Sequence, residues 1–310
     1  MLRKPAGALA FAILLFVVTY GAAGRAFCRT TTCENCEMPP QGCITDGIPL
    51  YWPTACISYS MQQDASDTAD LQTATDIAGL AFSAWEGAIC PSGESPFFRL
   101  ERSDAVTCDR HEYNDQQTTF GGNANIIVFR DDEWTATQDP HTLALTTVTY
   151  NKNTGEIYDA DIEVNSHIRL GGMQGISTET PVPPNKFDLQ SILTHEAGHF
   201  LGLAHSLVGC ASSPGHCPTM DAAYRTGSGD FRDLEPDDVA GICSIYARDR
   251  AVSDQSCMPR HGFSGECGTA GHKGCCSTAP GGASSRHGQG MFAALVGLGL
   301  WALRGRRASA

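Results

Sequence analysis

The stretch THEAGHFLGLAHS, residues 194–206, constrains this chain more than any other because it combines a helix, a turn and three histidines. Residues four apart lie on one face of a helix, so His195 and His199 are predicted to point at one shared atom. Gly202 can take the positive φ that ends a helix and turns the chain back. After such a turn, His205 can approach the same atom from outside the helix.

Three imidazoles with one position left for water are typical of a catalytic zinc, whereas structural zinc sites are closed by four protein ligands. Glu196 lies one step around the helix from His195, where a base beside a metal-bound water is expected. A bare HExxH occurs by chance on many helices, but the added glycine and histidine make a chance match rare. We therefore predict one zinc on His195, His199 and His205, with Glu196 as the general base.

The N-terminus predicts export. Arg3 and Lys4 precede an apolar stretch from Ala8 to Val18, and mostly small residues follow up to Ala26. This is the pattern of a signal peptide, which we expect to be cleaved after Ala26.

All fourteen cysteines lie beyond residue 26. Export into an oxidising compartment makes disulfides the default interpretation for most of them. Zinc or redox chemistry is the alternative for the CxxC of Cys33 and Cys36, but no second CxxC accompanies it, and we expect a disulfide. A bridge between Cys210 and Cys217 would brace the loop after His205; the remaining connectivity stays open.

Composition limits the class of partner. The hydrophobic share of 42% predicts a packed core rather than wholesale disorder. A formal net charge of −13 disfavours nucleic acid and anionic membranes as partners. We expect a monomer.

The C-terminus carries a second apolar stretch, the thirteen residues from Met291 to Leu303, followed by RGRR. As a helix it would span about 20 Å, short of the ~30 Å hydrocarbon core of a bilayer. A sorting signal that is read and removed fits better than a permanent anchor, by analogy with other removed tails.

These features divide the chain into five predicted segments. They are a signal peptide (1–26), a cysteine-rich N-terminal segment (27–46), a globular domain (47–250), a cysteine-rich linker (251–276) and a sorting tail (277–310).

Hydrophobic periodicity predicts the elements of the globular domain. Helices are expected over 67–89, from about Asp188 as N-cap through Leu203, and over 234–246. Strands are expected within 48–61 and at 97–100, 126–130, 143–150 and 158–164, the last two joined by the turn-rich NKNTGE.

Residues 194–206 resemble the zinc signature of the metzincin metalloproteases, and Ser206 after the third histidine resembles the matrixin branch. CPTM, containing Met220, is similar to the Met-turn that places a methionine beneath the zinc ligands. YDADIEVN (158–165) and LEPDDVAGICSIY (234–246) are similar to the matrixin fifth strand and C-terminal helix, so the resemblance covers about 47–247.

The resemblance implies an α+β fold: a twisted five-stranded mixed sheet with an active-site helix and a C-terminal helix. It implies a zinc endopeptidase that binds a peptide antiparallel along the edge strand, about 143–149. Calcium is usual in such proteins, and Asp131, Asp132 and Asp159 are candidate ligands whose spacing specifies no site.

The sequence also departs from the matrixin pattern. The loop of the family's structural zinc is missing, so His141 and His167 are expected to be surface histidines. Tyr224 lies four residues after Met220 rather than the two of astacins, and is not expected to stabilise a transition state. No cysteine switch of the matrixin type is found, which leaves the latency mechanism open.

Two functions from different classes remain. The first is a secreted endopeptidase that cleaves extracellular proteins. The alternative is a surface adhesion or binding module that keeps the zinc as a structural element. The C-terminal tail resembles the sorting tails of myxobacterial surface proteins (MYXO-CTERM type), with Cys275 or Cys276 as the processing site, which implies a location at the cell surface or outer membrane. The natural substrate and its S1′ preference stay open.

Overall fold

A computed structural model describes residues 27–33, 36, 39, 42–114, 123–134, 139–168, 175–210, 217–268 and 296–297. The predicted signal peptide, most of the predicted sorting tail, Cys275 and Cys276 lie outside the described residues. Within the described part, no helix is both long and apolar enough to cross a membrane.

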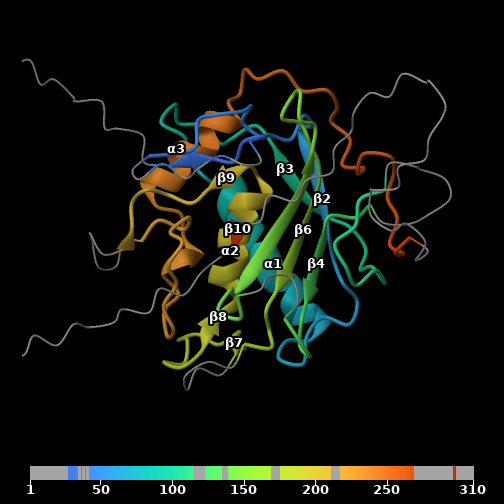
Figure 1. Ribbon diagram of the computed structural model, residues 1–310, viewed down its shortest axis with the longest axis vertical. Coiled ribbons are helices and arrows are strands. Elements are labelled where there is room, and N and C mark those ends of the chain that lie inside the picture. Colours follow the sequence, from blue (N-terminus) through green and yellow to red (C-terminus); the bar gives the residue numbers. More distant parts are fainter. Residues whose placement is uncertain are drawn as a thin grey trace, which may run out of the picture.

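One mixed sheet organises the domain (Figure 1). Its strands are β2 (Cys56–Met61), β3 (Arg99–Arg102), β4 (Ile126–Phe129), β5 (Ala144–Tyr150) and β6 (Ile157–Val164), joined by β10 (Val296–Gly297) from the C-terminal part of the chain. The order is β10-β5-β6-β4-β2-β3, and only β5 runs opposite to the other five strands. The predicted five-stranded mixed sheet is confirmed for the globular domain, in which β5 is the outermost strand. On the outer side of β5, β10 pairs with it, Val296 with Thr146 and Gly297 with Leu145.

The strand predicted at 97–100 begins two residues later, at Arg99 in β3. Phe97 and Phe98 contact Tyr246 instead of joining the strand. The Phe97 amide donates to the Tyr246 carbonyl, and the centroid of the Phe98 ring lies 4.8 Å from that of the Tyr246 ring. Tertiary packing therefore determines this boundary.

Two helices lie side by side on one face of the sheet (Figure 1). The first, α1 (Leu71–Glu86), buries Trp85, whose indole N–H donates to the Thr194 carbonyl of α2 at 2.8 Å. The second, α2 (Leu189–Phe200), begins at the predicted cap, since the Asp188 carboxylate accepts from the Ser191 amide. Because α2 is almost wholly buried, its side chains are held by packing on every side.

The prediction that Leu203 belongs to this helix is wrong. The helix ends at Phe200, and Gly202 follows with φ +96°. A Cβ at Gly202 would lie 2.8 Å from the Leu50 carbonyl oxygen, so glycine is required both for the backbone angle and for space. Leu203 instead lies in β9 (Leu203–Ala204), which pairs with β1 (Cys28–Arg29).

The remaining elements are short. The parallel pair β7 (Ile176–Ser177) and β8 (Phe187–Asp188) precedes α2, and a 3₁₀ turn, η2 (Asp230–Arg232), precedes α3 (Pro236–Ile245). Pro236 starts α3, where its missing N–H is no loss, and a reciprocal capping box joins Glu235 to Asp238.

Six disulfides join twelve of the described cysteines. The predicted pairs Cys33–Cys36 and Cys210–Cys217 are confirmed. The other four are Cys28–Cys43, Cys56–Cys257, Cys90–Cys243 and Cys108–Cys267.

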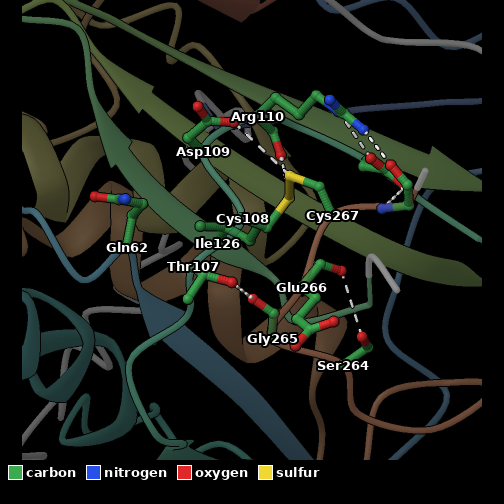
Figure 2. The surroundings of a disulfide bond; sticks show 12 residues. Gln62, Thr107, Cys108, Asp109, Arg110, Ile126, Ser264, Gly265, Glu266 and Cys267 are labelled. Atoms are coloured by element: carbon green, nitrogen blue, oxygen red, sulfur yellow. Dashed lines mark hydrogen bonds and ion pairs between the residues drawn. A yellow bond between two sulfur atoms is a disulfide. The ribbon is translucent and has the colours of Figure 1, made fainter. Parts of the chain in front are cut away.

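Two of these bridges fasten residues 251–268 to the domain: Cys257 bonds to Cys56 at the start of β2, and Cys267 bonds to Cys108 in the segment after β3. Around the Cys108–Cys267 bridge, Thr107 donates both its amide and its hydroxyl to the Gly265 carbonyl (Figure 2). Cys108 also belongs to a small apolar cluster with Val106, Ala124, Ile126 and Val128, away from the helices.

Candidate metal centre

Three histidines meet where α2 ends and the chain turns back. His195 and His199 lie one turn apart on α2, and their Nε2 atoms are 3.0 Å apart. Beyond Gly202, the His205 ring lies 4.9 Å from the ring of His199 and 5.2 Å from that of His195. One nitrogen of each ring falls in a group whose members all lie within 4.8 Å of one another.

The outer nitrogens of two rings are fixed by backbone carbonyls. His195 Nδ1 lies 2.6 Å from the Thr219 oxygen, and His199 Nδ1 lies 2.8 Å from the Leu203 oxygen. A carbonyl can only accept, so both Nδ1 atoms carry the hydrogen and both Nε2 atoms present lone pairs to each other. Partners of this kind orient the histidine ligands of metal ions.

The three rings fit a zinc ion. Two nitrogens on one tetrahedral zinc lie about 3.3 Å apart, given Zn–N bonds of about 2.0–2.1 Å, close to the observed Nε2 separation. Burial, together with the neighbouring histidines, lowers the pKa of His195 and His199 well below the usual value, and burial lowers that of His205 to about 4. Neutral imidazoles are the form that binds metal. The buried Nε2 of His205 has no hydrogen-bond partner among the described residues, so it is available as a ligand.

The turn that contains Met220 forms the floor of this cluster. The Met220 side chain is 1% exposed and packs against α2 at Gly198. The Asp238 carboxylate, on α3, accepts from the amides of Thr219 at 2.7 Å and Met220 at 3.0 Å. Because the Thr219 carbonyl orients His195, Asp238 links α3 to the metal ligands.

Glu196 is fully buried beside the histidines. Its Oε2 accepts from the Thr146 hydroxyl at 2.6 Å, whereas its Oε1 has no partner among the described residues. Burial raises the pKa of Glu196 to about 8, against the lowering effect of the Thr146 hydrogen bond. One carboxylate oxygen is thus fixed and the other remains available.

The candidate calcium ligands do not gather into one group among the described residues. Asp131 accepts from the Ser66 hydroxyl and the Asp67 amide. Asp159 is buried beside Asp161, and burial with the mutual repulsion of the two carboxyls raises the pKa of Asp159 well above its usual value.

Other predicted residues lie away from the metal cluster. His141 is half-exposed and paired with Asp139, and His167 is exposed with Nδ1 on the Asp131 carbonyl, as expected of surface histidines. The Tyr224 hydroxyl donates to the Ser228 carbonyl and accepts from the amide of Asp188, so it stabilises the N-cap of α2.

Sequence reasoning missed Thr146 and the role of Asp238. From the sequence, Asp238 is only one residue of the helix expected over 234–246, and Thr146 only one residue of the strand expected at 143–150. The register of β5 against β6 and the packing of β5 on α2 bring Thr146 to Glu196, fifty positions away.

A helix that carries HExxH, a chain that returns with a third histidine, and a methionine floor define a metallopeptidase-type zinc centre. The chain belongs to the matrixin family, whose model matches residues 51–247. It is therefore a zinc-dependent metallopeptidase by family, with proteins as its class of substrate. No curated protein matches the sequence.

Proposed function

We propose that this chain is an exported zinc endopeptidase in which Glu196 is the general base. The observation that carries the proposal is the buried Oε1 of Glu196, which has no partner in the described part of the chain and follows His195 on the helix that carries two of the three neutral imidazoles. Zinc binding alone does not require this carboxylate, whereas hydrolysis does.

The residues have separate tasks. His195, His199 and His205 would hold the zinc, which supplies a Lewis acid and lowers the pKa of water at the site. Oε1 of Glu196 takes the proton of the attacking water and passes it to the leaving amine. Met220 and Asp238 keep the ligands in place through contacts with α2 and with the Thr219–Met220 backbone.

We propose that the substrate binds as an extended strand along β5, because β5 is the outermost strand of residues 47–250 and lies against α2. In the structure β10 pairs antiparallel with this side of β5 at Leu145 and Thr146, so the substrate would take the place of β10 there. A cavity of about 420 Å³ elsewhere, between β2 and residues 253–262, is not lined by any of the three histidines. A strand-shaped substrate needs an edge rather than an enclosed pocket. The segment after Met220, residues 221–232, is the proposed wall of the S1′ pocket.

The test is zinc content combined with cleavage of a mixed peptide library by the parent, Glu196→Gln and Glu101→Gln. Glu101 is half-exposed on β3, so its variant controls for loss of a charge. We expect one zinc in all three proteins and cutting by the parent and Glu101→Gln only. Cutting by zinc-loaded Glu196→Gln would refute the general base.

The alternative, a zinc-containing binding module, predicts a different outcome of the same test. Every protein would then hold one zinc, and none would cut any peptide of the library. The free Oε1 of Glu196 argues against it, because a structural metal site has no use for such a group.

We also propose secretion, removal of residues 1–26 and attachment to the cell surface after processing at Cys275 or Cys276. The patterns of residues 1–26 and 277–310 support this. The intact mass of the surface protein should then correspond to a chain that starts at Phe27 and lacks Met291 to Leu303. A mature protein that keeps its full C-terminus would contradict the proposal.

A further inference from the structure

The contact between Thr146 and Glu196 joins β5 to α2, the helix that carries His195 and His199. The Thr146 hydroxyl lies 2.6 Å from Oε2 of Glu196 and 3.2 Å from the Glu196 carbonyl oxygen. Both residues are 0% exposed. A separation of about 2.5–3.0 Å is that of an O–H···O hydrogen bond, so the 2.6 Å contact is a short one.

The position of Thr146 follows from the sheet. Thr146 pairs with Ile162 of β6, and both face the helices, whereas its neighbours Leu145 and Thr147 pair with Glu163 and Asp161. Ala144 and Val148 share the inner face with Thr146 but have no hydrogen-bonding side chain. Of these three residues, only Thr146 can donate a side-chain hydrogen bond to Glu196.

The two oxygens of Glu196 are therefore unequal. Oε2 is held by Thr146, and Oε1 has no partner among the described residues. A buried carboxylate without a donor would be free to rotate toward any polar group, whereas one fixed oxygen determines the direction of the other.

We propose that Thr146 is a positioning residue for Glu196: its hydroxyl holds Oε2 so that Oε1 faces the metal and the attacking water. This inference rests on the proposed function. Thr146 does not touch the substrate through this hydroxyl and moves no proton. It acts only through the carboxylate.

The same contact places the proposed peptide-binding strand against the base. A substrate would pair along the outer side of β5, where β10 pairs with Leu145 and Thr146 in the structure, and the Thr146 side chain points toward Glu196 of α2.

The experiment compares the parent with Thr146→Val, Thr146→Ser and Thr75→Val. Valine keeps the branched shape without the hydroxyl, and serine keeps the hydroxyl without the methyl. Thr75, on α1, controls for a threonine-to-valine change outside the site. Zinc content is measured for each, with kcat and KM on a peptide that the parent cleaves.

We expect one zinc in every protein. Loss of a supporting partner of a metal site lowers activity by about 10–100-fold, so kcat of Thr146→Val should fall by this factor with KM within about twofold. Thr146→Ser should recover kcat to within about threefold, and Thr75→Val should match the parent. An unchanged kcat in Thr146→Val, or a Thr146→Ser as impaired as Thr146→Val, would overturn the inference. So would loss of zinc from Thr146→Val.

Crystal structures of the zinc-loaded proteins give a readout that does not depend on cleavage. In the parent and Thr146→Ser, the hydroxyl should lie within about 3.0 Å of Oε2, and in Thr146→Val the carboxylate should be displaced. A Glu196 that does not move in Thr146→Val would contradict the inference. If the parent cuts nothing, the proposed function fails, and the structures still decide whether Thr146 positions Glu196.

Discussion

Gly198 of α2 leaves the space that the side chain of Met220 fills. A Cβ built on Gly198 would lie 2.2 Å from Sδ of Met220 and 2.8 Å from Cζ2 of Trp85. The residue before the second histidine must therefore be glycine, because the methionine floor and α1 both pack against it.

Gly198→Ala is expected to destabilise the domain by about 1–3 kcal/mol, the usual effect of overpacking a filled core. The measurement is denaturant unfolding at equal zinc concentration. The matched control is Gly79→Ala on α1, where a Cβ has only the Tyr59 hydroxyl at 3.9 Å and alanine favours the helix. In a Met220→Ala background, the effect of Gly198→Ala should shrink; an equal loss in both backgrounds would contradict the packing argument.

Part of this arrangement could be predicted from the sequence, and part could not. The spacing of His195 and His199 is a local property of a helix, so the sequence predicted their shared direction. Of the three positions between them, the motif fixes Glu196 and leaves the other two free, and only the packing of Met220 and Trp85 shows why Gly198 is glycine.

Disulfide pairing could be predicted only between cysteines that lie close together in the sequence. The bridge between Cys210 and Cys217 spans seven positions and was predicted, whereas Cys108 and Cys267 are 159 apart and were not paired. Such contacts depend on which strands pair and in which register, and that information is not contained in any local pattern.

Removing the Cys108–Cys267 bridge (Figure 2) by Cys108→Ser with Cys267→Ser should loosen residues 258–268, which follow the bridge at Cys257 in the sequence. Chain entropy predicts a loss of up to about 5 kcal/mol for a loop of this length. Limited proteolysis followed by mass spectrometry should find new cuts in this segment.

The control for that experiment is the pair Cys33→Ser with Cys36→Ser. Its closed loop spans three positions, so the same entropy argument gives under about 2 kcal/mol. If residues 258–268 resist proteolysis without the long bridge, the backbone hydrogen bonds around Gly265 hold them alone.

The pair His111–Glu163 should give the stability a pH dependence. The Glu163 hydrogen bond raises the pKa of His111, so this contribution is complete below about 6.5 and is lost as pH rises through the folded-state value. Burial raises the pKa of Glu163, but hydrogen bonds from His111 and Arg130 outweigh it and lower the pKa. That contribution is complete above about 4.5 and is lost as pH falls through the folded-state value.

The difference in unfolding free energy between the parent and His111→Gln is therefore expected to be largest near pH 5.5 and to shrink by pH 8. Because the His111 side chain is 54% exposed, screening limits it to about 0.5 kcal/mol. A difference that grows toward pH 8 would have the wrong sign.

The N-terminus of α2 depends on Arg232. Its guanidinium binds Asp188 through two bonds, Nη2 to Oδ1 at 2.6 Å and Nε to Oδ2 at 2.8 Å, while Asp188 caps α2. The Asp188 side chain is 1% exposed, so Arg232→Met would leave a buried carboxylate without its cation. We expect a loss of about 2–4 kcal/mol, since Arg232 itself is partly exposed.

Arg232→Lys should recover only part of this stability, because an ammonium cannot reproduce the two parallel bonds of the guanidinium. Thermal unfolding measures each variant, and Arg99→Met, from the exposed pair with Glu101, should stay within about 0.5 kcal/mol of the parent. Zinc affinity should fall along with stability in Arg232→Met, because Asp188 caps the helix that carries His195 and His199. A variant that unfolds earlier yet binds zinc as tightly as the parent would show that the cap supports the fold without supporting the metal centre.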